Sequence, residues 1–389
     1  MKYYEEMEIV LNVGLNVAGK RGIDSYMGNL VEWLAELDAR NRYLVFSYFF
    51  RNHAMKRARL PHPARPNFEM LAPRWPETVI NALERRGLPV VERFLLTGRH
   101  PDIYHSLTGI LPHLRGPKTV TTIYDLCHER IFRATPEYRP GLFATPDYRA
   151  TALRADRVIA VSQATKGDLI EIYGVPEGKI EVIETGANLR SHRPVTISGI
   201  LAATRRRYKL PQRYIVLLGP FEYRRNAEAV IDALAAAEPD SSCALAFVGQ
   251  GGLYRNELEA RARKLGLSKR VVLCGYVADE DMAAVFSGAQ AFVHPSRLEG
   301  FGTVSLEAMA CGCPVLTSNI PSILEAVGDA ALTVAPEDTG ALTRALRELL
   351  ANAQLRADLR FRGLERAALF SYEKIAGKVL SLYERLAGK

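Results

Sequence analysis

The sequence contains few cysteines and no long hydrophobic run. Five cysteines occur in 389 residues, and an odd number of cysteines, mostly embedded in apolar stretches, does not make a disulfide framework. No apolar run approaches the roughly 18 residues of a membrane-spanning helix, and the N-terminal residues lack the layout of a signal peptide. We therefore expect a cytoplasmic protein without structural disulfides.

Low-complexity tracts and blocks of like charge are also absent. The formal net charge is +8, from 51 basic and 43 acidic residues. The basic residues are dispersed along the chain, which disfavours nucleic acid as a partner. Cys311 and Cys313 are separated by a single residue and no second pair accompanies them, so the sequence predicts no zinc site.

The length of the chain predicts two domains. A chain of 389 residues exceeds one ordinary hydrophobic core and suggests domains of about 150 to 200 residues each. Short apolar runs alternate with segments of helical periodicity in both halves, which is typical of α/β domains with a parallel sheet. Strands are expected at 9–13, 43–50, 102–106, 119–125, within 155–162, within 180–186, and at 214–218, 245–249, 271–275, 289–295 and 315–318.

A glycine-rich loop follows the first expected strand. Gly14, Gly19 and Lys20 match the spacing of a nucleotide-triphosphatase phosphate loop, but Arg21 stands where a Ser or Thr hydroxyl would bind magnesium. Gly22 completes the loop, and Asp24 is a reasonable cap for the helix that follows. A triphosphatase therefore remains an alternative that the spacing alone favours.

Polar side chains follow two expected strands of the first half. His105 lies near the end of the strand at 102–106, Tyr124 and Asp125 end the strand at 119–125, and His128 follows it. Ligands bind beyond the carboxyl ends of the strands in doubly wound sheets. Asp125 and His128 are therefore candidate catalytic residues, and His105 and the Tyr124 hydroxyl are further candidates for a polar contact at this site.

Residues 51–100 are basic, with prolines near their start. A helix is expected over 77–96, interrupted at Pro89, in which apolar residues such as Phe94 are mixed with Arg85, Arg86 and Arg93. One interpretation is a surface helix with a solvated basic face. The other is a patch for the acceptor or for an anionic membrane surface, where apolar side chains enter the bilayer and arginines meet headgroups.

The segment 299–307 has the features of a ligand-binding turn. It follows an apolar run that ends at Pro295, and its two glycines permit a sharp turn close to a ligand. A helix is expected over about 304–311, and its N-terminal amides would suit a phosphate. Two carboxylates, Glu299 and Glu307, would accept hydrogen bonds from sugar hydroxyls. The turn itself comprises Gly300, Phe301, Gly302 and Thr303, the last as helix cap.

Two adjacent arginines follow the strand at 214–218. Arg224 and Arg225 precede Asn226, a good cap for the alanine-rich helix that comes next. Guanidinium groups bind phosphate oxygens in a bidentate way and neutralise the charge of a departing diphosphate. The acidic run 279–281 is interpreted as the start of a helix, so no metal ion is predicted and the arginines take its role.

Residues 296–315, SRLEGFGTVSLEAMACGCPV, resemble the signature of the retaining glycosyltransferases of family 4, the mannosyltransferase-like group 1 glycosyl transferases. The resemblance implies the GT-B fold, in which two Rossmann-like doubly wound parallel-sheet domains face each other across a cleft. It implies that Arg224 and Arg225 bind the donor diphosphate and that Glu307 binds the ribose. Glu299, with the backbone of 300–303, would hold the sugar. Tyr276 and Val277 would bind the base, and Gly22 would lie over the diphosphate and acceptor.

The resemblance also sets the expected domains and activity. Residues 1–190 would form the acceptor domain, 191–369 the sugar-nucleotide donor domain, and 370–389 a helix that crosses back to the first. The expected reaction is metal-independent transfer of a hexose, with GDP-mannose favoured as donor, to a glycan or lipid-linked acceptor in polysaccharide biosynthesis. No cofactor is expected. The protein would be cytoplasmic, with peripheral contact at the inner face of the membrane. A sugar-nucleotide epimerase and a non-catalytic binding module remain alternatives.

Overall fold

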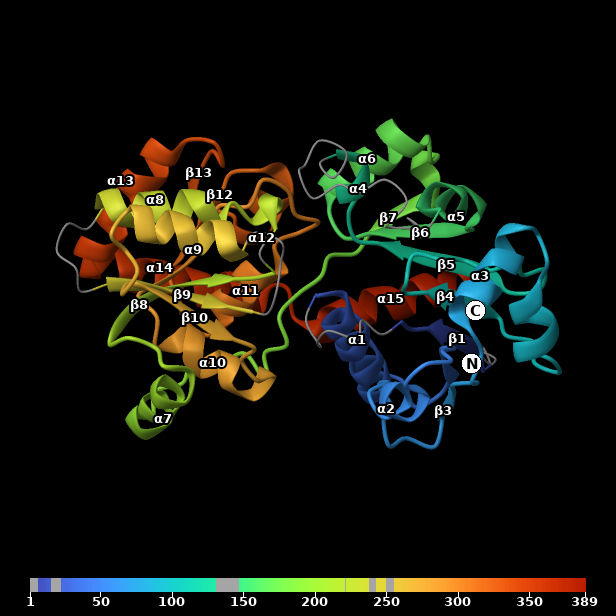
Figure 1. Cartoon of the computed structure of the whole chain (residues 1–389). Helices are drawn as coiled ribbons and strands as arrows, with labels where there is room; N and C mark the ends of the chain where they lie inside the picture. The colour runs from blue at the N-terminus through green and yellow to red at the C-terminus, as the bar shows by residue number, and fades with distance from the viewer. Residues whose placement is uncertain (1–5, 15–21, 131–146, 221, 238–242, 250–254) are drawn as a thin grey trace. The chain divides into compact units, whose positions relative to one another are not determined.

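The computed structural model describes residues 6–14, 22–130, 147–220, 222–237, 243–249 and 255–389. The chain divides into two compact units, which are described separately (Figure 1). The N-terminal unit comprises residues 1–126, 144–185 and 372–389, and the C-terminal unit comprises residues 127–143 and 186–371. The phosphate-loop match over 14–21 lies outside the described residues except for Gly14.

The N-terminal unit is built on a parallel sheet of seven strands in the order β3-β2-β1-β4-β5-β6-β7. Its strands are β1 (Glu8–Asn12), β2 (Arg42–Phe46), β3 (Phe68–Leu71), β4 (Ile103–Ser106), β5 (Lys118–Ile123), β6 (Arg157–Ala160) and β7 (Ile180–Val182). Its helices are α1 (Ile23–Leu37), α2 (His53–Arg57), α3 (Glu77–Arg85), α5 (Tyr148–Arg154), α6 (Gln163–Tyr173) and α15 (Tyr372–Ala387), with short turns at Val91–Leu95 and Glu177–Lys179.

Helices bury both faces of this sheet. Successive residues of β1 alternate between two cores, with Ile9 and Leu11 in one and Val10 in the other, because neighbouring side chains of a strand point to opposite faces. The first core contains side chains of α1 and α15, which lie side by side in Figure 1. The second contains side chains of α3, α5 and α6. The last helix of the chain is thus part of the N-terminal unit.

The C-terminal unit has a parallel six-stranded sheet in the order β10-β9-β8-β11-β12-β13. The strands are β8 (Arg213–Leu218), β9 (Cys243–Val248), β10 (Val271–Gly275), β11 (Ala291–His294), β12 (Val315–Ser318) and β13 (Leu332–Val334). The helices are α4 (Cys127–Arg130), α7 (Ser198–Tyr208), α8 (Ala227–Ala237), α9 (Arg255–Lys264), α10 (Asp279–Ser287), α11 (Thr303–Ala310), α12 (Pro321–Val327), α13 (Thr339–Ala351) and α14 (Ala353–Ala368), with a single turn at Tyr223–Arg225.

The strand order of the C-terminal unit identifies where a ligand would bind. From β8 the chain builds outward through β9 to β10, then returns to the other side of β8 with β11, β12 and β13. Ligands of doubly wound sheets bind beyond the carboxyl ends of the two strands at which this direction reverses. Those strands are β8 and β11.

The helix expected over 77–96 is broken around Pro89 as predicted: α3 ends at Arg85, and the second part is only a single π-helical turn at Val91–Leu95. Two expected helix caps were wrong. Gly22, not Asp24, precedes α1 as its N-cap, and Gly302, not Thr303, precedes α11. Both glycines have positive φ values, 70° and 93°, which favour glycine because it has no Cβ.

His105 is fully buried in β4, with Nδ1 2.5 Å from the hydroxyl of Tyr383 in α15 and Nε2 2.8 Å from Oγ1 of Thr122. Burial lowers the pKa of His105 to about 3. The imidazole therefore stays neutral at physiological pH. It links the last helix to the sheet and is not open to a substrate.

This depressed pKa makes folding stability depend on pH. Between pH 6.5 and pH 3 the unfolded chain binds a proton at His105 that the folded chain excludes, so stability is lost as the pH falls. We expect the free energy of unfolding to decrease by about 2 kcal/mol between pH 7 and pH 5 from this group. Urea denaturation of the protein and of His105→Gln at both pH values measures the difference. An equal pH dependence in the two proteins would contradict it.

Candidate functional site

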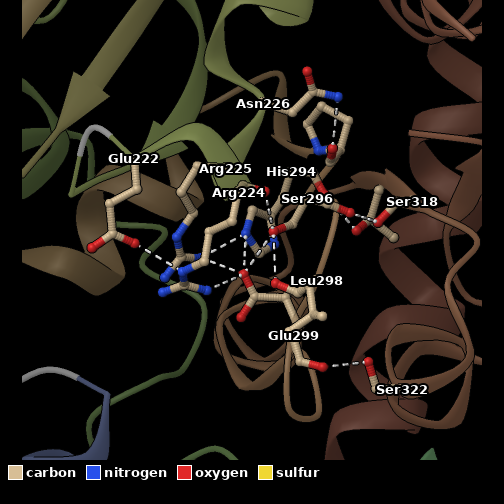
Figure 2. A network of polar contacts seen from close by, with 12 residues as sticks. Glu222, Arg224, Arg225, Asn226, His294, Ser296, Leu298, Glu299, Ser318 and Ser322 are labelled. Carbon is tan, nitrogen blue, oxygen red and sulfur yellow. Dashed lines mark hydrogen bonds and ion pairs between the residues drawn. The ribbon is translucent and has the colours of Figure 1, made fainter. Parts of the chain in front are cut away.

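Three charged side chains meet beyond the carboxyl ends of β8 and β11. Arg224 and Arg225 lie in the turn after β8, and Glu299 lies in the loop after β11. The Nη1 atoms of both arginines are 3.0 Å from Oε1 of Glu299. Figure 2 shows the two guanidinium groups converging on this one oxygen. The sequence separated these residues by more than seventy positions, and the fold brings them together.

Glu299 is held as a carboxylate. Its side chain is 13% exposed. Burial alone would raise its pKa, but the charges of Arg225 and Arg224 hold the pKa of Glu299 well below its ordinary value. Among the described residues, Oε2 of Glu299 receives no hydrogen bond. The group can therefore accept hydrogen bonds from a ligand but cannot act as an acid at neutral pH.

Several hydroxyl and amide groups fix the loop that carries Glu299. Oγ of Ser296 is 2.8 Å from Oε1 of Glu299, and the hydroxyls of Ser318 and Ser322 donate to the carbonyls of Ser296 and Glu299, both at 2.6 Å. Asn226 is fully buried. The expectation that its side chain caps α8 was wrong, because its oxygen makes no such hydrogen bond. Its Nδ2 donates to the carbonyls of Pro295 and Pro336, while Oδ1 has no partner among the described residues. The amide therefore fastens the turn after β8 to the end of β11.

Arg225 is almost completely buried, at 9% exposure, and sits against His294, the last residue of β11. Its Nη1 is 2.6 Å from Nε2 of His294. Burial lowers the pKa of Arg225, and the carboxylate of Glu299 opposes that effect. Arg224 is also held from a second side, because its Nε donates to Oε2 of Glu222 at 2.8 Å. Both guanidinium groups are thus oriented before any ligand arrives.

The turn after Glu299 divides its side chains between core and surface. Phe301 is 3% exposed and its ring centroid is 5.3 Å from that of Phe370, so its side chain belongs to the core and only its backbone can face a ligand. Gly300 and Thr303 are partly exposed around Gly302 at the start of α11. Glu307 is partly exposed one turn into that helix.

Tyr276 and Val277 directly follow β10, at the same carboxyl edge of the sheet. Tyr276 is 43% exposed, whereas the side chain of Val277 is fully buried. The acidic run 279–281 opens α10, as expected, but Ala278 is the N-cap. Asp281 accepts hydrogen bonds from Arg207 and Tyr208 of α7 at 2.9 and 2.6 Å. Within the described ranges, no group of three or more His, Cys, Asp or Glu side chains could hold a metal ion.

The remaining candidates lie outside this cluster. Gly22 precedes α1 in the N-terminal unit, Asp125 follows β5 in the same unit, and His128 lies in α4. Asp125 and His128 are partly exposed. The hydroxyl of Tyr124 donates to the carbonyl of Leu107 at 2.8 Å, and burial raises its pKa well above the ordinary value. Tyr124 therefore already has a structural hydrogen bond.

Sequence reasoning missed three members of the cluster: Glu222, His294 and Ser296. His294 ends an apolar run, and a histidine at the carboxyl end of a buried strand is itself a signal in this kind of fold. Ser296 lies in the resembled segment, but its residue type alone indicates no role. Glu222 gave no signal, because an acidic residue two positions before an arginine is common on any surface.

Comparison with known proteins supplies the family. The model for Glycosyltransferase Family 4 matches residues 21–191, and the model for glycosyl transferases group 1 matches residues 204–366. The chain is a family 4 glycosyltransferase. The predicted family and the predicted class of enzyme are therefore confirmed. The group 1 match contains Arg224, Arg225, His294 and Glu299.

Two curated relatives are mannosyltransferases of Escherichia coli. O-antigen chain mannosyltransferase B is 29% identical over 289 residues, which are 73% of this chain and 74% of that protein. The serotype-specific mannosyltransferase WbdA is 28% identical over 277 residues, which are 69% of this chain but only 34% of WbdA. The matched part thus spans about a third of that longer relative. The first relative, an O-antigen chain mannosyltransferase, agrees with the expected setting in polysaccharide biosynthesis.

The fold is shared with solved glycosyltransferase structures. Sucrose-phosphate synthase from Thermosynechococcus elongatus superposes with a TM-score of 0.76 at 24% identity, covering 98% of this chain and 99% of that one. Together with the two parallel sheets, this confirms the predicted GT-B fold class. Among the described helices, none is both long and apolar enough to cross a bilayer.

Proposed function

We propose that this glycosyltransferase transfers a hexose from a nucleoside-diphosphate sugar to a hydroxyl of a glycan or lipid-linked acceptor, with retention of the anomeric configuration. The convergence of Arg224 and Arg225 on Glu299 at the point where the strand order reverses supports this proposal. Two preoriented cations suit a diphosphate, and a carboxylate with one open oxygen suits the hydroxyls of the attached sugar.

In the proposed step, the acceptor oxygen replaces the diphosphate oxygen on the anomeric carbon. The bond between the anomeric carbon and the diphosphate oxygen breaks, and the electron pair leaves with the diphosphate, where Arg224 and Arg225 stabilise the added charge. The acceptor hydroxyl attacks the oxocarbenium-like carbon from the face that the diphosphate leaves. Its proton passes to a diphosphate oxygen. No metal ion is needed, because the guanidinium groups supply the positive charge.

Further proposed contacts come from the family resemblance. Glu307 would bind the ribose, the backbone of 300–303 the sugar and diphosphate, and Tyr276 and Val277 the base. Asp125 and His128 would act as catalytic residues, and Gly22 would lie over the diphosphate and the acceptor. The two mannosyltransferase relatives support GDP-mannose as the favoured donor. The acceptor would be a glycan or a lipid-linked saccharide, as suits an enzyme of polysaccharide biosynthesis.

A donor screen followed by product analysis tests this proposal. Thermal shift with GDP, UDP, ADP and dTDP sugars in the presence of EDTA should identify one stabilising donor, with GDP-mannose expected to give the largest shift. NMR of the transferred sugar should then show an unchanged anomeric configuration. Release of an altered sugar nucleotide without acceptor would favour an epimerase. Binding without turnover would favour a non-catalytic module, and stabilisation by ATP with magnesium alone would favour a triphosphatase.

We also propose that the N-terminal unit contacts an anionic membrane surface. Phe50 and Phe94 are 53% and 64% exposed. Cζ of Arg74 lies 5.3 Å from the ring centroid of Phe50, and the ring centroids of Trp75 and Phe94 are 6.3 Å apart. Each exposed phenylalanine therefore has a neighbouring side chain. Exposed Arg85, Arg86 and Arg93 add positive charge nearby in the sequence. Apolar side chains among arginines suit anionic headgroups.

Cosedimentation with vesicles tests this proposal. The protein should cosediment with anionic but not with zwitterionic vesicles, and equal binding to both would contradict the proposal.

A further inference from the structure

The contact between Arg225 and His294 constrains the protonation of the imidazole. A guanidinium group can only donate hydrogen bonds, so at 2.6 Å from Nη1 of Arg225 the Nε2 atom of His294 must accept. The proton of a neutral imidazole is then on Nδ1. Because Nε2 carries no proton, its 3.3 Å approach to Oε1 of Glu299 is a close contact and not a hydrogen bond.

The surroundings of His294 support a neutral ring. The side chain has no exposed surface, and Nη1 of Arg225 lies 2.6 Å from its Nε2. Burial lowers the pKa of His294, the neighbouring arginines add to this, and Glu299 opposes it. The ring of Phe292 packs 5.4 Å away on the same strand. Nδ1 has no partner among the described residues, so no second contact explains the polar ring at this buried position.

Two acceptors thus occupy one end of the Arg225 guanidinium. Oε1 of Glu299 and Nε2 of His294 both lie against Nη1. In the part of the chain that the structure describes, neither Nη2 nor Nε of Arg225 has a hydrogen-bond partner. Two contacts at Nη1 fix the plane of the group, which a single carboxylate oxygen shared with Arg224 could not do alone. The contacts at Nη1 therefore also fix the direction in which the Nη2 hydrogens of Arg225 point.

We propose that His294 is a positioning residue that accepts a hydrogen bond from Arg225 as a neutral imidazole and thereby orients this arginine for the donor diphosphate. The inference rests on the proposed function, because it requires that Arg225 binds the diphosphate. It goes beyond that function by assigning a role to a buried residue that need not touch the ligand. Removal of the hydrogen-bond acceptor at position 294 should weaken diphosphate binding only when Arg225 is present.

Isothermal titration calorimetry with a nucleoside diphosphate tests this, using whichever of GDP, UDP, ADP and dTDP binds most tightly to the full chain. His294→Leu should weaken binding about tenfold, since one charge-assisted hydrogen bond is lost. His294→Gln should bind within about threefold of the unchanged protein, because its side-chain oxygen reaches the position of Nε2. In an Arg225→Ala background, His294→Leu should cause no further loss.

Two controls separate this role from a general effect on packing. Thr317→Val removes a hydroxyl that donates to the carbonyl of His294 at 2.8 Å without touching the imidazole, and it should leave diphosphate affinity unchanged. If His294→Leu does not fold, His294→Asn replaces it, because its amide reaches only as far as Nδ1; it should bind about tenfold more weakly, in contrast to His294→Gln.

The outcomes distinguish the positioning role of His294 from the proposed binding of the diphosphate by Arg225. The positioning role is overturned if His294→Leu binds as tightly as the unchanged protein, if the glutamine variant is as weak as the leucine variant, or if the loss is equally large in the Arg225→Ala background. A Thr317→Val variant as weak as His294→Leu would also overturn it. Unchanged binding by Arg225→Ala alone would instead overturn the proposed role of Arg225 in the diphosphate site.

Discussion

Replacement of Glu299 by glutamine is expected to slow sugar transfer about 1000-fold, comparable to the largest losses measured for single groups that stabilise charge in a transition state. Glutamine keeps the shape of the side chain and an oxygen that can accept hydrogen bonds from both arginines, but it removes the negative charge proposed to face the reacting sugar. Affinity for the nucleoside diphosphate alone should not fall, because the arginines retain their charge and lose a competing anion. Steady-state kinetics and calorimetry on the same preparations measure the two effects.

Glu337 offers a matched control for this substitution. Its side chain is 69% exposed and pairs with Arg297, on the same loop as Glu299. Glu337→Gln therefore removes a nearby carboxylate outside the cluster and should leave transfer unchanged. Transfer at full rate by Glu299→Gln, or an equal loss in both variants, would contradict the role given to Glu299.

Replacement of Arg225 by alanine is expected to weaken nucleoside-diphosphate binding about 100-fold, or about 2.7 kcal/mol. The guanidinium group is buried and its Nη2 donors are uncommitted among the described residues, so water replaces its contact with phosphate poorly. The same change leaves Glu299 with fewer counter-charges, so a fall in the melting temperature should accompany it. Calorimetry and thermal unfolding give the two values.

Arg261 provides the corresponding control. It pairs with Asp232 on the surface of the same unit, and its side chain is 46% exposed. Arg261→Ala removes the same formal charge from the C-terminal unit but should change diphosphate affinity by less than about twofold. Equal weakening by both substitutions would mean that net charge, and not the geometry of the cluster, determines binding.

Much of the fold could be predicted from apolar periodicity, because the strands of a parallel sheet covered on both faces are nearly continuous apolar runs. This held for β1, β8 and β11. It failed for β3 and β13, each of which lies at one edge of its sheet. Both are short, and each has a single buried residue, so neither shows a long apolar pattern.

The chemistry of the site could be predicted from residue types, but the contacts between its residues could not. The residue types in the segments 224–226 and 299–307 indicate phosphate and sugar chemistry, but their contact depends on which strands are neighbours in the sheet. Asn226 illustrates the limit. Its position before a helix predicts a cap, whereas tertiary structure gives its amide two carbonyls from distant loops. The contacts of His294 with Arg225 and of Ser296 with Glu299 likewise appear only in the structure.

A crystal structure of the protein with a non-transferable analogue of its donor is the most direct test of the account. The diphosphate is predicted to lie within hydrogen-bonding distance of Arg224 and of Nη2 of Arg225, with a sugar hydroxyl on Oε2 of Glu299. A diphosphate bound away from both arginines, or a sugar that makes no contact with Glu299, would contradict it.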